Sequence, residues 1–132
     1  MSALDDQVDP TASDDSVIPR FTWWDRRGGR EWVQYDFDRP TTVSGSQVYW
    51  CDERRINAHC RVPQSWRLFY RAEGKWKQVS GAGTYGVEMD RFNRVAFDRV
   101  ETTALRLQAE LQRDWSGGIL EWKVEDFQDE NR

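Results

Sequence analysis

Apolar and polar residues alternate with a period of two along most of the chain after residue 20. The alternation is clearest at residues 105–111, where every second residue is Leu or Ala and the residues between are polar. A period of two is typical of a β-strand with one buried face. Shorter segments with the same pattern lie at residues 33–37, 48–50, 66–70, 95–97 and 120–124. No segment carries a 3.6-residue apolar stripe over three turns, so we predict an all-β fold.

Turn-forming residues separate these predicted strands. Glu73-Gly74 lies between residues 66–70 and residues 76–79 and predicts a hairpin. Arg39-Pro40 is expected to end the strand that precedes it. The segment Gly81–Gly86 matches G-x-G-x-x-G, but no helical pattern follows it, so we interpret it as a loop and not as a nucleotide site. Short strands joined by such loops predict one antiparallel β-sandwich domain over residues 1–132.

Residues 1–20 form an acidic segment with five Asp and little apolar periodicity, and we expect a loop there. Calcium takes six to eight oxygen ligands, often from one loop and a distant carboxylate. Asp6, Asp9 and Ser13 could supply the loop ligands and Glu121 the distant one. The alternative is a solvated acidic loop that binds no ion.

Charge and composition exclude several classes of protein. The 132 residues carry a net charge of -4, which disfavours binding to nucleic acid or to an anionic membrane surface. No apolar run is long enough for a membrane helix, and the first residues do not have the pattern of a signal peptide. His59 has no recognisable nucleophile partner, so we do not expect catalysis. We expect a monomer.

The chain has two cysteines, Cys51 and Cys60, and one histidine, His59, and these are too few to supply a standard four-ligand structural zinc site alone. The two cysteines could close a short loop as a disulfide, but spacing alone leaves both the bridged and the reduced state open.

Aromatic residues are the most informative feature, because 14% of the chain is aromatic and eight residues are Trp. We expect Trp32, Trp66, Trp76 and Trp122 in the core. Trp23 and Trp24 are consecutive, so in an extended chain one faces the core and the other a surface. A sugar site needs an aromatic platform beside polar side chains. The candidates for the platform are Trp24, Trp50, Tyr85 and Trp115, and those for hydrogen bonding to hydroxyls are Asp25, Asp52 and Arg61.

A series of segments along the chain matches a known pattern in order and spacing. They are Ala3–Asp6 followed by Ser13 and Trp23, and then Trp32–Phe37, Val62–Tyr70, Gly74–Trp76, Thr103–Leu107 and Ser116–Trp122. Taken in order, these segments resemble the discoidin-like, coagulation-factor C-type β-sandwich, a fold shared by family 32 of the carbohydrate-binding modules. More narrowly, the segments Pro19–Asp25, Cys60–Pro63 and Ser116–Trp122 resemble parts of a C-terminal domain of bacterial glycoside hydrolases of the β-L-arabinofuranosidase type.

The resemblance implies a non-catalytic jelly-roll sandwich that binds sugar through the loops at one end. It implies a structural calcium ion held by Asp6, Asp9, Ser13 and Glu121, although Gln7 stands where the family usually has glycine. Such a module would target an attached glycoside hydrolase to plant cell-wall polysaccharide, and it would be exported as part of a larger bacterial enzyme, secreted or periplasmic. The alternative is a structural accessory sandwich that packs on the catalytic domain and binds no sugar.

Overall fold

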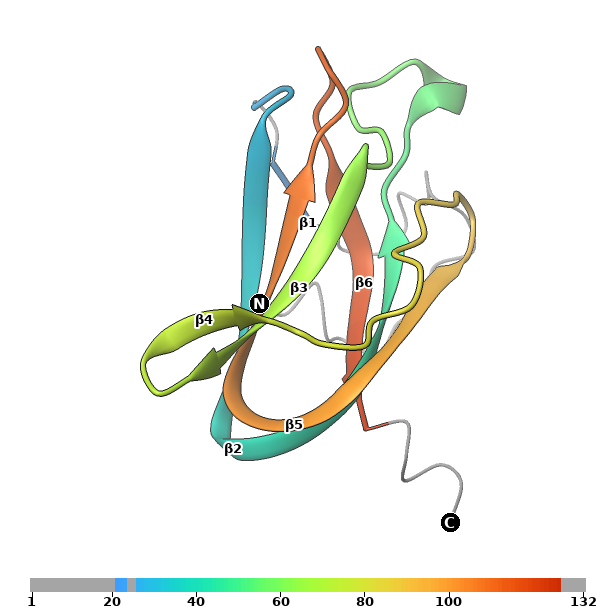
Figure 1. The fold of residues 1–132 in the computed structure, drawn as a ribbon. Coiled ribbons are helices and arrows are strands. Elements are labelled where there is room, and N and C mark those ends of the chain that lie inside the picture. Colours follow the sequence, from blue (N-terminus) through green and yellow to red (C-terminus); the bar gives the residue numbers. More distant parts are fainter. Residues whose placement is uncertain (1–20, 24–25, 127–132) are drawn as a thin grey trace.

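The computed structural model describes residues 21–23 and 26–126. Within them, the strands are β1 (Phe21–Thr22), β2 (Arg30–Trp50), β3 (Ser65–Ala72), β4 (Lys75–Gln78), β5 (Phe92–Glu110) and β6 (Gly118–Glu125). One short 3₁₀ helix, η1 (Arg54–Ile56), follows β2, and no helix of the described part is long and apolar enough to cross a membrane. The strands pair antiparallel in the order β1-β6-β2-β5-β3-β4 (Figure 1).

The two long strands, β2 and β5, pass from one layer of the molecule to the other. The first part of β2 pairs with the last part of β5, and β3 and β4 extend this first layer. The second part of β2 pairs with the first part of β5 and with β6, and β1 extends this second layer. Figure 1 shows both long strands bending at the bottom of the view. The predicted antiparallel β-sandwich is confirmed.

The bend in β2 corrects one expectation about strand ends. The pairing register with β5 shifts between Asp36 and Thr41, and Arg39-Pro40 lies inside this interval. Proline has no backbone N–H to donate, so the ladder is interrupted there. The strand nevertheless continues to Trp50, and Arg39-Pro40 marks a bend instead of the expected end. In the same way, the predicted segment 95–97 and residues 105–110 of the predicted segment 105–111 belong to one bent strand, β5, which ends at Glu110.

The core lies between the two layers and is built from alternate residues of each strand. The first layer contributes Val33, Leu68 and Leu107, and the second contributes Val48 and Trp122; all are at most 3% exposed. Burial of these apolar side chains is the main stabilising contribution to such a sandwich.

The predicted core positions of the tryptophans are correct for Trp66 and Trp122 and wrong for Trp32. Trp32 is 52% exposed and Trp76 is half-buried, whereas Trp66 and Trp122 are at most 2% exposed. The physical reason is the phase of the alternation, because Val33 occupies the core-facing position and places its neighbour Trp32 on the outer face of the layer. Trp23 is buried, as one of the two consecutive tryptophans was expected to be.

Candidate functional site

Three loops meet at one end of the sandwich, at the top of Figure 1, and backbone hydrogen bonds join them. The loop after β2 contacts the loop after β5 through a bridge between Cys60 and Ser116. The Arg61 amide donates to the Ser116 carbonyl at 3.0 Å, and the Ser116 amide donates to the His59 carbonyl at 3.1 Å. The third loop precedes β2, and its Gly28 amide donates to the Trp115 carbonyl at 2.9 Å. We call the surface formed by these three loops the loop end.

Asp52 organises the longest of these loops. Its carboxylate is fully buried and accepts four hydrogen bonds, from the Val62 amide at 2.9 Å and from three N–H groups of Arg54 at 2.8–3.0 Å. Burial alone would raise the pKa of Asp52, but the hydrogen bonds from Arg54 and Val62 outweigh it and hold the pKa below its ordinary value. The charged carboxylate therefore closes the loop between residues 52 and 62.

Arg61 and Trp115 form the aromatic and charged part of the loop end. The guanidinium carbon of Arg61 lies 3.8 Å from the centroid of the Trp115 ring, a cation–π contact. One nitrogen of this guanidinium, Nη1, donates to the carbonyls of Ala58 and Cys60 at 2.7 and 2.8 Å, so the group is fixed from below. Arg61 is 8% exposed and Trp115 is 36% exposed. The structure thus brings together two of the predicted sugar-contacting residues, with Trp115 accessible.

Two other residues that the sequence predicts as sugar contacts, Trp50 and Asp52, are fully buried, so that prediction is wrong for both. Trp50 is fully buried, packs edge-on against Trp66, and donates its indole N–H to the Gly86 carbonyl at 3.2 Å. A ring without exposed surface cannot stack on a sugar. Asp52 is equally inaccessible, because its oxygens are used inside the loop. Both residues are buried and stabilise the loops next to them. Their burial could not be predicted from the sequence, because they lie where β2 ends and a polar loop begins.

Tyr85 lies in the loop between β4 and β5 and is half-buried. Its ring packs edge-on against Trp66, with 4.9 Å between the ring centroids. It also lines a hollow of about 480 Å³ next to Gly86 and Arg91. The sequence correctly predicts that Gly81–Gly86 forms a loop. It does not reveal that the Gly86 carbonyl accepts the indole N–H groups of both Trp50 and Trp66 and so anchors this loop to the core.

Of the predicted calcium ligands, only Glu121 lies among the described residues. It is on β6 opposite Tyr49, and its side chain is fully buried. An ionised carboxylate is stable in such a position only with a cation or with hydrogen-bond donors. The other predicted calcium ligands, Asp6, Asp9 and Ser13, lie outside the described residues, and so do the predicted sugar contacts Trp24 and Asp25.

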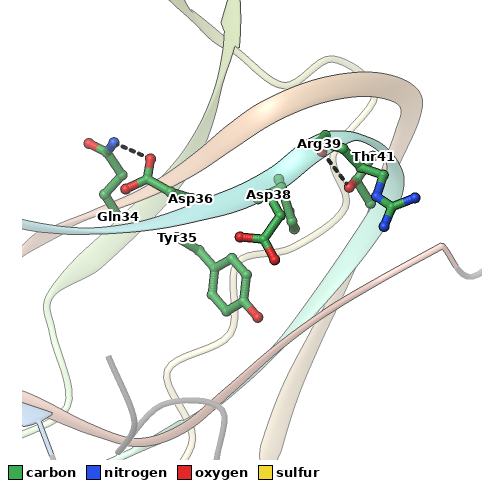
Figure 2. A pocket seen from close by; sticks show the side chains of 7 residues that line it. Gln34, Tyr35, Asp36, Asp38, Arg39 and Thr41 are labelled. Carbon is green, nitrogen blue, oxygen red and sulfur yellow. Dashed lines mark hydrogen bonds between the residues drawn. The ribbon is translucent and has the colours of Figure 1, made fainter.

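A separate hollow of about 570 Å³ lies along the bend of β2. Figure 2 shows its side chains on a single stretch of strand, with Gln34 bonded to Asp36 and Thr41 bonded to the Arg39 carbonyl. Its lining residues in the described part of the chain fall between positions 34 and 41. Among residues 21–23 and 26–126, no other strand adds a polar group to this lining, in contrast to the loop end.

Comparisons with solved structures agree with this architecture. A β-galactosidase from Streptococcus pneumoniae matches with a TM-score of 0.76 at 18% identity, over 94% of this chain and 83% of that one. A family 32 module from Clostridium perfringens, solved with GalNAc-β-1,3-galactose, matches with a TM-score of 0.58 at 12% identity, over 74% and 67%. A pectin-binding module matches with a TM-score of 0.58 at 13% identity, over 93% and 77%. The chain has the fold of carbohydrate-binding modules.

The comparisons by sequence give no match, since no family model and no curated protein is similar to this chain. The likeness is therefore one of fold, at identities too low to transfer a ligand or a set of site residues. Some matched chains are parts of enzymes: one is a chitosan-binding module derived from a chitosanase/glucanase of Paenibacillus, and another is a putative α-L-fucosidase from Bacteroides thetaiotaomicron, of which this chain covers 21%.

Proposed function

We propose that this chain is a non-catalytic carbohydrate-binding module that directs an attached glycoside hydrolase to plant cell-wall type polysaccharide. The observation that carries the proposal is the exposed indole of Trp115 held against the fixed guanidinium of Arg61 at the loop end. Sugar rings have apolar C–H faces and a rim of hydroxyls, so an aromatic face beside a fixed donor matches both. The fold supports the same reading, because the module from C. perfringens was solved with an oligosaccharide.

The proposed site is shallow, because one accessible ring and one largely buried guanidinium offer little enclosed surface. We expect weak binding by the isolated module. Attachment to a catalytic domain raises the local concentration of the module near the polysaccharide and compensates for weak intrinsic affinity. Trp24 and Asp25, which follow Trp23 directly, remain candidates for the same site, and we propose that the whole enzyme acts outside the cytoplasm, secreted or periplasmic.

The test is affinity electrophoresis and calorimetry of the full chain with soluble arabinan, xylan and galactan. We expect retardation by at least one of these neutral polymers and its loss in Trp115→Ala. Trp32→Ala is the matched control, because it removes an exposed indole from the outer face of the first layer, which is not part of the three loops of the loop end. If a folded sample binds none of the polymers, the alternative of a structural accessory sandwich is favoured instead.

We further propose a structural calcium ion held by Glu121 together with Asp6, Asp9 and Ser13. Carboxylate and hydroxyl oxygens are the ligands that calcium prefers, and a bound cation would stabilise a carboxylate as completely buried as that of Glu121. Calcium should raise the melting temperature of the protein, and a chelator should reverse the rise. Glu121→Gln should abolish this response, whereas Glu125→Gln, on the same strand and only partly buried, should retain it. An unchanged melting temperature with and without the chelator would contradict the proposal.

A further inference from the structure

Away from the loop end, the outer face of the first layer carries aromatic and basic side chains from four neighbouring strands. Directly paired residues share one face of a sheet, and the registers pair Phe69 with Arg106 and Arg71 with Trp76. Gln34, two residues after Trp32, is paired with Arg106. We call this surface the Trp–Arg face. Its residues are Trp32, Arg67, Phe69, Arg71, Trp76 and Arg106.

The Trp–Arg face is held in place by cation–π contacts. The guanidinium of Arg106 lies 4.1 Å from the centroid of the Trp32 ring and 4.3 Å from that of Trp76. Arg71 lies 5.3 Å from the Trp76 ring. Arg106 also donates from Nη2 to the side-chain oxygen of Gln34 at 3.1 Å. Aromatic and cationic groups therefore alternate across the face in a preorganised row, which lowers the entropy cost of binding a ligand there.

The exposure of Trp32 sets this face apart from a solvated sheet surface. At 52% exposure, about half of a large indole remains in contact with water, and among the large apolar side chains of the described part only Ile56 is comparably exposed. On the opposite side of the same strand, Val33 is 3% exposed. Trp32 adds nothing to the core, and its free ring surface suits the flat C–H face of a sugar ring.

The charge of the Trp–Arg face is opposite to that of the chain. The chain carries a net charge of -4, but Arg67, Arg71 and Arg106 all project from this one face. The carboxylates of the same face lie at its margins: Asp36 accepts a hydrogen bond from Gln34, and Glu110 pairs with Arg30 at 3.2 Å. Guanidinium groups bind carboxylates through paired hydrogen bonds.

From this arrangement we infer that the Trp–Arg face is a second glycan site, distinct from the loop end, for a polysaccharide whose sugar units carry carboxylates. Trp32 would stack on a sugar ring, while Arg67 and Arg71 would pair with the carboxylates. The inference goes beyond the proposed function, because it concerns a different surface and a different class of glycan. A single-stranded nucleic acid also combines stacking with negative charge, but its phosphates would meet an acidic protein with only this small basic area.

The test compares polygalacturonate with the same polymer after reduction of its carboxyl groups. We expect the full chain to bind polygalacturonate in calorimetry and affinity electrophoresis, with at least about tenfold weaker binding to the reduced polymer. Added salt should weaken the binding, because the guanidinium groups are exposed and screened. Polydeoxythymidine serves as a polyanion with bases in place of sugar rings, and equal or tighter binding to it would overturn the inference.

Variants locate the binding on this face. Trp32→Ala should weaken polygalacturonate binding by about tenfold, by analogy with the loss of one stacked ring, and the double variant Arg67→Gln/Arg71→Gln should weaken it and flatten its dependence on salt. The matched control is Lys75→Gln/Lys77→Gln, which removes the same charge from the same hairpin. Lys75 and Lys77 pair with Ala72 and Tyr70, on the opposite face. Equal losses in the two double variants would contradict a localised site.

The two glycan proposals fail independently. Trp115→Ala should leave polygalacturonate binding intact, and Trp32→Ala should leave binding to neutral polymers intact. If polygalacturonate binding is lost in Trp115→Ala and retained in Trp32→Ala, the acidic glycan binds at the loop end and the second site does not exist. If the wild-type chain binds neutral polymers but does not bind polygalacturonate, the inference about the Trp–Arg face is wrong and the proposed function still holds.

Discussion

The guanidinium of Arg61 lies over the indole of Trp115 at 3.8 Å, and its Nη1 is bonded to two backbone carbonyls beneath it. The buried arginine thus fixes the orientation of the more exposed ring. A ring held in one orientation loses little conformational entropy when a sugar stacks on it. This relationship makes Arg61 a positioning residue for Trp115.

Replacing Arg61 by alanine should therefore affect stability and binding together. We expect Arg61→Ala to lower the free energy of unfolding by about 1–2 kcal/mol, through the lost hydrogen bonds and cation–π contact. Binding of neutral glycan should fall as well, because Trp115 is no longer held. Denaturant titration and calorimetry measure the two effects. Arg113→Ala, at an exposed arginine of the neighbouring loop, is the control and should change neither quantity.

The lowered pKa of Asp52 leads us to expect a loss of folding stability in acid. Its pKa lies below its ordinary value of 3.8, so the folded state binds the proton more weakly than the unfolded state. The stabilisation is therefore fully present above the ordinary pKa and is lost as the pH falls through the lower, folded value. Asp52→Asn should cost about 1–3 kcal/mol at neutral pH, since the amide cannot accept the same four hydrogen bonds.

The pH dependence separates this effect from general destabilisation. The difference in unfolding free energy between the wild type and Asp52→Asn should shrink as the pH is lowered from 6 to about 3. Asp38→Asn, at an exposed carboxylate on β2, should show a difference near zero throughout. A difference for Asp52→Asn that stays constant over this range would show that the carboxylate charge does not stabilise the loop.

The sequence was sufficient to predict the sandwich and much of its core, but only part of the site. The two-residue period at Val33 and at Leu105–Leu111 depends on local burial alone, and it is confirmed. The position of Trp32 depends on which phase of the alternation faces the core, and a tryptophan fits either phase. The burial of Trp50 depends on how segment 80–91 folds, and that of Asp52 on how segment 51–62 folds. Both loops are held by hydrogen bonds between residues distant in sequence, from Trp50 to Gly86 and from Val62 to Asp52.

A substitution at Gly118, which pairs with Thr22 of β1 at the start of β6, should introduce a steric clash. A β-carbon at this position would lie 2.6 Å from the Phe21 carbonyl oxygen and 2.9 Å from the Thr22 side chain, closer than such atoms approach. Because the nearest atom is backbone, β1 would have to move. Gly118→Ala should therefore lower the free energy of unfolding by about 1–3 kcal/mol in a urea titration. Gly83→Ala, where the added carbon meets nothing within 4 Å, should be neutral within about 0.5 kcal/mol. Equal effects at both positions would show that β1 accommodates the methyl group.

The last prediction concerns the two cysteines, whose bridging the sequence leaves open. The thiols of Cys51 and Cys60 and a carboxylate oxygen of Glu53 all lie within 4.8 Å of one another, and both cysteines are buried. One molecule of oxidised glutathione should convert the two thiols to a disulfide: the glutathione disulfide bond breaks as the bond between the two cysteine sulfurs forms, and the two thiol hydrogens end on two molecules of reduced glutathione. Closing so short a loop should stabilise the protein by about 2–3 kcal/mol.

Reaction rate and mass test this prediction. The hydrogen bond with Cys51, and then burial, raise the pKa of the Cys60 thiol, so little thiolate forms at neutral pH and bridging should be slow there and faster as the pH rises. Intact-mass spectrometry detects the loss of two hydrogens, and denaturant titration measures the added stability. Cys51→Ser is the control and should show neither change. If the oxidised wild type is no more stable than the reduced protein, the bridge must distort the loop that Asp52 and Arg61 organise, and the two thiols are then better accommodated unbridged.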